Sequence, residues 1–342
     1  MATVYVNNQA TGGADDGSSE ADGFLTIDQA MNWVTTAGTG PHKIWVKGGT
    51  DYTETVTIDT AGSSNGWIDV EGYSSTTGDG GKFTIDAESS RPNCLTISGI
   101  GQAYYRIRNG IFERATNTGA GCNTQRILFQ DCEANNNAVG GFFIGYDSAI
   151  YACSADGNGG RGFQTGGARA WVAFCVASNN GDHGFMTTNV LFCKMLSNAG
   201  SGNYMGGGIF VNNTIDGDAQ DTDFGITYGG IPPVLIANNI FYDCTTGIDT
   251  TNPGSYEVVI RNNLLNSNTT DYNTTVPSSE QGYDITSAPD FVDEVNGDYR
   301  LNTTSPARNA GTDASGTSGN GMDIGAHQSE DEGSGTRIVM AG

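Results

Sequence analysis

Four consecutive segments decide the fold: RILFQDCEANNNAVGGFFI (126–144), AIYACSADGNGGRGFQT (149–165), AWVAFCVASNNGDHGFMT (170–187) and NVLFCKMLSNAGSGNYM (189–205). Each joins a short apolar run, a Cys, a polar turn of Asn, Asp and Gly, and a second short apolar stretch. Segments 208–227, 234–250 and 258–273 repeat the pattern with Asn in place of the Cys. The positions in register are Cys132, Cys153, Cys175, Cys193, Asn213, Asn239 and Asn263, and the intervals between them are those of a solenoid repeat.

A repeat of this length, made of short strands and Asn/Gly turns, cannot close a hydrophobic core alone. Stacked parallel copies bury a continuous core, and each copy rises about 4.8 Å, the spacing between paired strands. Leucine-rich repeats need regularly spaced Leu, which the segments lack, and a propeller blade needs about 40 residues. The sequence therefore predicts an all-β fold, a right-handed parallel β-helix with rungs of about 22 residues.

The Cys and Asn in register are interpreted as structural ladders. Cys is small and apolar and suits an inward stack, whereas Asn bonds from rung to rung at a bend and tolerates the left-handed conformation. Neighbouring Cys fall within disulfide range. We nevertheless expect reduced thiols, because the start MATVYVNNQATGG has no basic region and no apolar core of a typical secretory signal.

The N-terminal part differs from the repeats. In GFLTIDQAMNWVTTAG (23–38), apolar residues recur near 3.6-residue spacing, Thr26 and Gln29 form a capping-box pattern, and Gly38 suits the end of a helix. We predict a short helix over 27–37 that covers the raw end of the stacked sheets. Strands are predicted within TVYV (3–6), KIWVKG (43–48), YTETVTI (52–58), WIDVEGY (67–73) and KFTIDA (82–87).

Composition excludes several classes of protein. The chain has 342 residues, 51 Gly, 7 Cys, and 15 Lys and Arg against 38 Asp and Glu, for a formal charge of −23. That charge disfavours binding to nucleic-acid phosphates. No apolar run approaches the length that a membrane-spanning helix needs, so none is expected. Seven Cys spread through so long a chain do not make a small disulfide scaffold.

The order of a first strand, a helix of the LTIDQAMNWV kind, and then KIWVKGGTDYTETVTI and WIDVEGY resembles the right-handed parallel β-helix proteins of the pectate-lyase-like superfamily. The C-terminal stretches DYRLNTTSPARNAGTD (298–313) and MDIGAHQ (322–328) resemble the ends of bacterial and phage proteins of that group. The resemblance implies a strand and capping helix over 1–40, a β-helix over 41–290, and a C-terminal cap and tail over 291–342. It implies fold more than function, because the superfamily holds lyases, hydrolases, epimerases, adhesins and phage structural proteins.

A catalytic role is considered for one group of turn residues. GNGGRGF (157–163) and NNGDHGF (179–185) place Arg161 and His183 at the same register, with Asp182 adjoining and Lys194 on the next rung. A base beside a positive group suits a polysaccharide lyase, which neutralises a uronate carboxylate and removes a proton. Charged residues are also routine in Asn/Gly turns, and we interpret these residues as solvated turns, with catalysis as the alternative. No paired-carboxylate motif of a glycosidase stands out.

A second group is the acidic stretch DGDAQDTD (216–223), with Asp216, Asp218, Asp221 and Asp223. Four carboxylates so close together can supply oxygen ligands for Ca²⁺, although the stretch lacks the Gly and Glu of an EF-hand loop. The alternative is a solubilising insertion. His42 and His327 lie outside the repeats and are expected at the surface or in packing.

Three functions remain open. The first, which we favour, is a non-catalytic structural protein of a phage virion, either capsid-decorating or tail-associated. Such a protein is expected to form a homo-oligomer and to contact other virion proteins. The second is a lyase or depolymerase acting on acidic polysaccharide, and the third is a carbohydrate-binding adhesin without catalysis. All three predict a virion or extracellular location, and none involves nucleic acid or a membrane.

Overall fold

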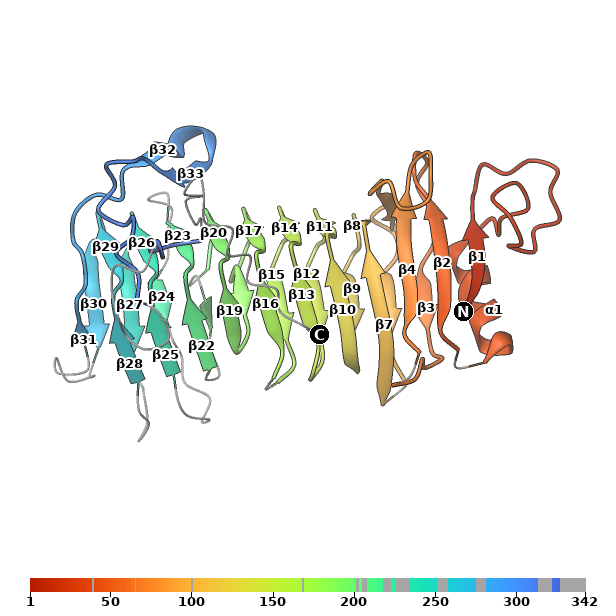
Figure 1. Cartoon of the computed structure of the whole chain (residues 1–342), viewed down its shortest axis with the longest axis horizontal. Helices are drawn as coiled ribbons and strands as arrows, with labels where there is room; N and C mark the ends of the chain where they lie inside the picture. Colours follow the sequence, from red (N-terminus) through yellow and green to blue (C-terminus); the bar gives the residue numbers. More distant parts are fainter. Residues whose placement is uncertain are drawn as a thin grey trace.

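The computed structural model describes residues 1–38, 40–64, 66–99, 101–167, 169–200, 203–204, 208–217, 223–225, 234–250, 258–274, 281–312 and 322–326. Over these residues the chain winds into a parallel β-helix, with each turn contributing strands to separate sheets that run along the long axis (Figure 1). The predicted all-β solenoid is confirmed.

Sheet A has twelve described strands and runs the length of the solenoid. In order they are β1 (Ala2–Val6), β2 (His42–Lys47), β4 (Ile68–Tyr73), β7 (Gln102–Arg108), β10 (Gln125–Gln130), β13 (Ala149–Tyr151), β16 (Trp171–Ala173), β19 (Asn189–Leu191), β22 (Gly208–Val211), β25 (Val234–Ala237), β28 (Val258–Arg261) and β31 (Gln281–Gly282). All neighbours in this order pair in parallel.

Sheets B and C complete the turns. Sheet B contains β5 (Phe83–Asp86), β8 (Gly110–Glu113), β11 (Glu133–Asn135), β14 (Ser154–Asp156), β17 (Val176–Ser178), β20 (Lys194–Leu196), β23 (Thr214–Asp216), β26 (Ile240–Tyr242) and β29 (Leu264–Asn266). Sheet C contains β3 (Val56–Ile58), β6 (Asn93–Ile97), β9 (Thr118–Cys122), β12 (Gly140–Ile144), β15 (Arg161–Thr165), β18 (Phe185–Met186) and β21 (Asn203–Tyr204). A smaller sheet joins β24 (Asp223–Gly225), β27 (Thr246–Thr250) and β30 (Thr270–Thr274).

The predicted ladder of Cys and Asn lies at the bend between sheets A and B and is continuous. From the second member onward, each Sγ or Oδ1 accepts a hydrogen bond from the backbone N–H of the ladder residue one rung earlier, at 3.3–3.4 Å to sulfur and 2.7–3.0 Å to oxygen. Its members are Cys132, Cys153, Cys175, Cys193, Asn213, Asn239, Asn263 and Asp284. The residue before each member has a positive φ, which turns the chain from one sheet to the next.

A second ladder, which the sequence analysis did not identify, lies at the bend between sheets B and C. The side chains of Asn137, Asn158, Asn180 and Asn198 are buried and stack one above the other. The Oδ1 atom of each accepts the N–H of the ladder position one rung earlier at 2.9–3.2 Å, and amide-to-amide bonds of 2.8–2.9 Å join the four side chains. Buried polar groups with all partners present are stabilising, because an unmade bond in this environment is costly.

Stacked aromatic side chains fill the interior. Phe142, Phe163 and Phe185 are fully buried on successive strands of sheet C, with ring centroids 5.3 and 5.0 Å apart and planes within 7° of parallel. This spacing follows the rise of one strand per rung.

Helix α1 (Ile27–Ala37) matches the predicted range and covers the first rungs (Figure 1). Thr26 and Gln29 form the capping box, and the Glu54 carboxylate accepts the N–H groups of Ile27 and Asp28 at 2.8 and 3.1 Å. His42 packs here as expected: its ring is buried, lies edge-on to a Trp and bonds the Gly38 carbonyl at 2.7 Å. Among the described residues no helix is long and apolar enough to cross a membrane.

The C-terminal stretch packs on the outer face of sheet B. It includes the antiparallel strands β32 (Phe291–Asp293) and β33 (Asp298–Leu301), joined by a 3₁₀ turn over Glu294–Asn296. Their apolar side chains form a second core with outward residues of β26 and β29, composed of Ile240, Leu264, Phe291, Tyr299, Leu301, Ala307 and Ile324. Residues 313–321 and 327–342 of the predicted cap and tail lie outside the described residues, as does His327.

Asn180→Ala is expected to lower the free energy of unfolding by about 3 kcal/mol, because it leaves buried groups on both neighbouring rungs without a hydrogen-bond partner. Urea denaturation followed by circular dichroism measures this. The control is Asn32→Ala on the exposed face of α1, where the amide makes one surface bond and the expected change is below about 0.5 kcal/mol. Equal effects of the two substitutions would contradict the ladder's role.

All seven cysteines are free and buried in the structure, and their reduced state stays a prediction. Burial raises the pKa of the Cys94 thiol to about 12, so the reactive thiolate is scarce near neutral pH. We expect the native protein to resist Ellman's reagent in mildly alkaline buffer, and the urea-unfolded protein to react at every cysteine. Rapid reaction of any thiol in the native protein would argue against the buried stack.

Candidate functional site

Three of the four predicted catalytic residues come together. Arg161 begins β15, and the pairing of β15 with β18 keeps the predicted offset between these rungs, so His183 lies one rung away. Between them, Asp182 places one carboxylate oxygen 3.3 Å from Arg161 Nε and the other 3.5 Å from His183 Nε2. Arg161 also donates to Gln164 Oε1 at 2.9 Å. The group lies at the turn before sheet C, with Asp182 and Arg161 partly open to solvent.

Lys194 is placed elsewhere. It begins β20 in sheet B, where its outward side chain is in the area covered by the C-terminal stretch. Burial lowers its pKa, and the carboxylate of Asp298 on β33 opposes that shift. The lysine is therefore associated with the packing of the C-terminal stretch on sheet B rather than with Arg161 and His183.

The predicted Ca²⁺ ligands are described only in part. Asp216 ends β23, is buried, and accepts a hydrogen bond from Tyr299 Oη at 2.5 Å, which ties the C-terminal stretch to sheet B. Asp218 and Asp221 lie outside the described residues, and Asp223 begins β24. The Ca²⁺ site stays a prediction.

Asp51, Asp86 and Glu113 form another group of carboxylates, with ligand atoms within 4.8 Å of one another. Such oxygen donors suit a divalent cation. Arg114 already forms an ion pair with Asp86, however, and burial together with the charge of Asp51 raises the pKa of Glu113. Repulsion among these carboxylates is thus already relieved in part by Arg114.

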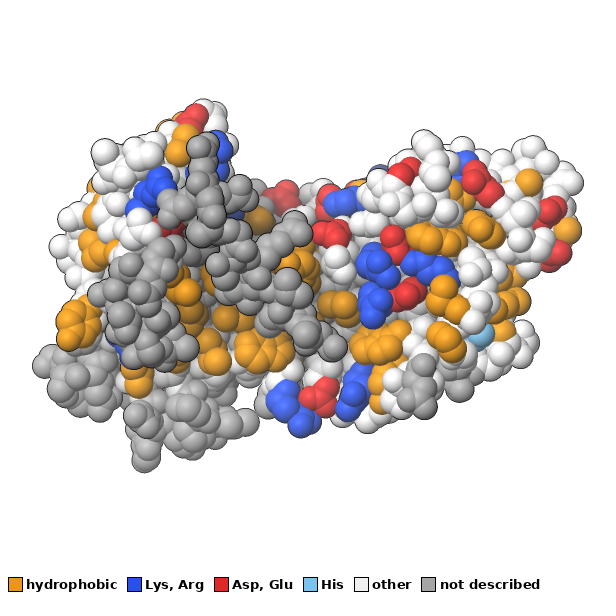
Figure 2. Space-filling view, in the orientation of Figure 1, with side chains coloured by type: hydrophobic (Ala, Val, Ile, Leu, Met, Phe, Trp, Pro, Cys, Tyr) orange, Lys and Arg blue, Asp and Glu red, His pale blue; other side chains and the backbone are white. Residues whose placement is uncertain are grey.

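The most distinctive group of charges lies on the outer face of sheet A near the N-terminal end (Figure 2). Strands β2, β4 and β7 alternate inward apolar residues with outward charged ones, and the outward set forms the basic cluster: Lys43, Asp69, Glu71, Arg106 and Arg108. Strand pairing sets Asp69 between Lys43 and Arg106, and Glu71 beside Arg108. Cations thus flank carboxylates across the strands, the arrangement in which cross-strand charges attract.

Ion pairs connect the basic cluster throughout. Glu71 pairs with Lys43 and, at 3.0 Å, with Arg108 Nη1. Asp69 lies 3.4 Å from Arg106 Nη1 and 3.6 Å from Arg108 Nη2. Because each carboxylate contacts two cations, the cluster is held in one geometry and keeps one positive charge in excess.

Aromatic rings flank the basic cluster. The Lys43 ammonium lies 4.1 Å from the centre of the Trp45 ring, and the Arg106 guanidinium lies 5.6 Å from that of Trp67. Trp67 meets Tyr104 edge-on, and Arg126 lies 5.3 Å from the Tyr104 ring. Cation–aromatic contacts of this kind hold long side chains in place.

The charge of the strands on this face is opposite to that of the chain, although Glu20 of the adjoining loop pairs with Lys47. Strands β2, β4, β7 and β10 carry five of the 15 Lys and Arg residues but only two of the 38 Asp and Glu residues. A local positive region on a strongly acidic protein concentrates anionic ligands at that place.

A surface hollow of about 310 Å³ adjoins the basic cluster and is lined by Tyr5, Ser18, Ser19, Glu20, Ser75, Thr76 and Thr77. Tyr5 continues the row that runs through Trp45 and Glu71 to Arg108. The loop that bounds the hollow is held by Asp79, whose carboxylate accepts the N–H groups of four loop residues. These bonds hold the pKa of Asp79 well below its usual range. The hydroxyl groups and the aromatic ring of the hollow thus lie next to the charged side chains of the basic cluster.

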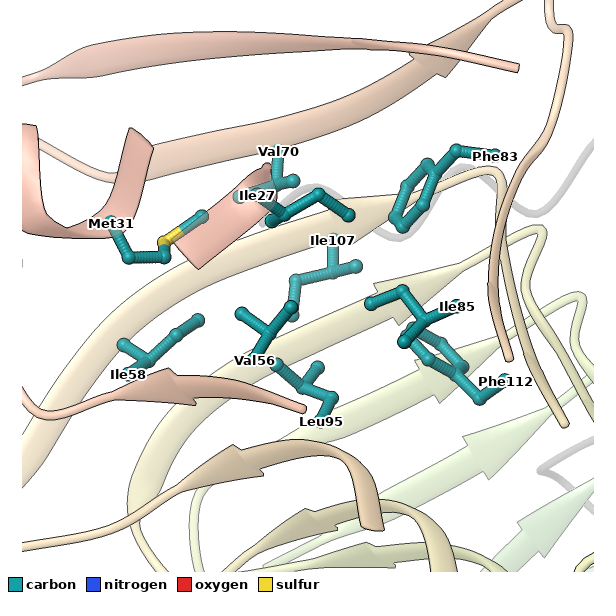
Figure 3. Close-up of a pocket in the computed structure, with 10 residues that line it drawn as sticks. All are labelled: Ile27, Met31, Val56, Ile58, Val70, Phe83, Ile85, Leu95, Ile107 and Phe112. Carbon is teal, nitrogen blue, oxygen red and sulfur yellow. The ribbon is translucent and has the colours of Figure 1, made fainter. Parts of the chain in front are cut away.

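A second cavity is internal and carries no chemistry. It lies under α1, measures about 10 Å³, and is lined entirely by apolar side chains (Figure 3). A void of this size and lining is a packing defect that stays dry.

The basic cluster is not among the sites predicted from the sequence, although the sequence carries a signal for it. The motifs KIWVK, IDVEGY and YYRIR each alternate charged and apolar residues. The sequence does not show which residues of these motifs pair, because the early rungs differ in length. The number of residues from Lys43 to Asp69 is much smaller than the number from Asp69 to Arg106. The regular repeats begin only later in the chain.

No family model matches the sequence, and no curated protein matches it. Solved structures do. The pectate lyase Pel9A aligns with a TM-score of 0.62 and 16% identity over 96% of both chains. A rhamnogalacturonan lyase aligns at 0.59 and 12% identity over 89% of this chain and 96% of that one. The protein of ORF18 of Geobacillus virus E2 aligns with a TM-score of 0.48 and 12% identity over 83% of this chain and 61% of that one.

Identities this low establish architecture and leave activity open. The resemblance noted in the N-terminal and C-terminal motifs is confirmed at the level of fold. This chain has the parallel β-helix fold that the pectate lyase Pel9A and the rhamnogalacturonan lyase also have.

Proposed function

We propose that this protein is a non-catalytic structural β-helix whose basic cluster binds an acidic carbohydrate. The observation that carries the proposal is the charge reversal on sheet A, where β2, β4, β7 and β10 hold five cations and two carboxylates in a chain of net charge −23. A polyanion repelled by most of the surface is attracted to this face.

The chemistry of the face suits a uronate polymer. Arg106 and Arg108 offer planar donors that match sugar carboxylates, and the carboxylates of Asp69 and Glu71 can accept hydrogen bonds from sugar hydroxyls. Trp45 and Trp67 present apolar rings beside them, and the hollow adds Ser and Thr hydroxyls along the same row. A flat sheet face with these groups in rows fits an extended chain better than a compact ligand.

The same features suit a phage virion component, capsid-decorating or tail-associated, which is the setting we propose. Two ladders of side-chain bonds and a continuous aromatic core make a stiff body. A virion or extracellular location, a homo-oligomeric state and other virion proteins as partners belong to this proposal. Sugar binding by such a body serves attachment and needs no catalysis.

Arg106→Gln/Arg108→Gln is expected to weaken binding of polygalacturonate or alginate about tenfold or more, a loss of about 1.4 kcal/mol or more. Isothermal titration calorimetry at low ionic strength measures it, and added salt should weaken wild-type binding in the same way. The matched control, Arg91→Gln/Arg300→Gln, removes two exposed, ion-paired arginines elsewhere and should bind like wild type. Equal loss in both variants, or no wild-type binding to any anionic polymer, would refute the assignment.

A lyase is a second candidate, favoured by the contact of Asp182 with both Arg161 and His183. In such a reaction the neutral imidazole takes the proton at C5 of a uronate while the guanidinium neutralises the sugar carboxylate. The C4–O bond then breaks as the C4–C5 double bond forms, and the leaving oxygen takes a proton from the imidazolium so formed. Asp182 orients the imidazole for this step.

This candidate predicts the ultraviolet absorbance of an unsaturated uronate on incubation with an acidic polysaccharide. Arg161→Ala/His183→Ala should reduce the rate at least about 100-fold. Arg169→Ala, which breaks an exposed ion pair with Asp147, should leave the rate unchanged. A panel of polymers that stays uncut, with and without Ca²⁺, would exclude the lyase and leave binding as the function.

A further inference from the structure

The outer face of sheet A changes character along the solenoid. Beyond the basic cluster, most outward positions in the same rows are apolar, with Gln130, Asn189 and Arg261 as polar exceptions. The larger apolar side chains form what we term the apolar strip: Leu128, Trp171, Leu191, Ile209, Val211, Leu235 and Val259. These side chains are neither fully buried nor fully exposed. An apolar face of this extent on a protein surface marks a contact surface.

Aromatic side chains at the neighbouring bend extend the apolar strip. Phe174 and Phe192 stack on successive rungs with centroids 5.0 Å apart, and Tyr151 at the end of β13 contacts Phe174 at 5.2 Å with its ring tilted by 59°. Tyr151 is 39% exposed and Phe174 is 40% exposed. Three large rings in contact on the outside of adjacent rungs add to the apolar area without contributing to the interior.

Two of these aromatic residues occupy a conformation that their side chains disfavour. Phe174 and Phe192 have φ of 57° and 53°, whereas the corresponding bend positions on the next rungs are Asn212, Asn238 and Asn262. Asn adopts the left-handed region readily, and a bulky residue does so only under strain. Asn would adopt this backbone conformation with less strain than Phe. We therefore infer that the two Phe side chains are needed for a contact outside the solenoid's own core.

We propose that the C-terminal segment of this same chain, centred on Ile338, Val339 and Met340, docks on the stacked aromatic residues and the adjoining apolar strip. Residues 327–342 lie outside the described residues. Their sequence, HQSEDEGSGTRIVMAG, has one apolar run, and it follows a polar, Gly-containing stretch that can lead it to a neighbouring surface.

The described chain ends beside this surface. The Ala326 N–H donates to Thr214 Oγ1 at 3.0 Å, and Asn212 Nδ2 donates to the Asp323 carbonyl at 3.1 Å. Both contacts are at the bend between sheets A and B. At the same bend, Phe192 lies one rung away and Phe174 lies two rungs away. Those rungs lie about 5 and about 10 Å along the axis. The chain from Ala326 to Ile338 reaches up to about 40 Å when extended, so the span is well within range.

The docking is tested with an environment-sensitive fluorophore on Met340→Cys in the full chain. The native cysteines are buried, so the introduced thiol is the one that labels. We expect blue-shifted emission with high anisotropy. Adding Phe174→Asn/Phe192→Asn should change it to the red-shifted, low-anisotropy emission of a fluorophore in solvent. Because Asn suits both bend positions, the midpoint of thermal unfolding should not fall.

The matched control replaces Val295, a 90% exposed apolar residue on the C-terminal stretch, by Asn, and should leave the emission unchanged. Solvent-like emission in the parent, or emission that ignores the Phe substitutions, overturns the proposal. A signal lost on dilution overturns it too, because it places the segment on a second copy. A signal independent of concentration supports docking within one chain.

Discussion

The structure depends on hydrogen bonds between identical positions of successive rungs. A parallel β-helix must turn its chain several times per rung, and each turn places backbone N–H groups in the interior, where no water reaches them. The two ladders satisfy these groups with side chains from the next rung. At the bend between sheets A and B, Cys sulfur and Asn oxygen do the same task in one continuous column. Where the ladders run, these contacts hold the same position of each rung above that of the rung before, in step with the strand pairing.

With the interior fixed in this way, the outer faces are free to differ. Sheet B is covered by the C-terminal stretch, which packs apolar residues on β26 and β29 and bonds Asp216 through Tyr299. Sheet A carries basic and aromatic residues at one end and apolar residues at the other. Its rows are straight because the strands pair in register, so residues from distant parts of the chain align along one face. A rigid scaffold with rows of this kind suits an extended polymer.

The candidate sites differ in how strongly their residues are fixed. In the basic cluster, Asp69 and Glu71 each contact two cations, and tryptophan rings hold two of those cations. Arg161, Asp182 and His183 form a smaller group at a turn, in which a single carboxylate makes both contacts. Preorganisation favours the basic cluster as a binding face, because fixed side chains lose less freedom on binding.

The sequence by itself determined the solenoid, its period, the capping helix over 27–37 and the Cys/Asn ladder, because these depend on local patterns that recur. It also placed Arg161 beside His183, since a constant offset holds between their rungs. Tertiary structure alone decided the rest. Lys194 fell within the region of sheet B covered by β32 and β33, which a repeat pattern cannot show. The rungs that carry Lys43, Asp69 and Arg106 are unequal in length. Only the strand pairing shows that these three side chains lie side by side.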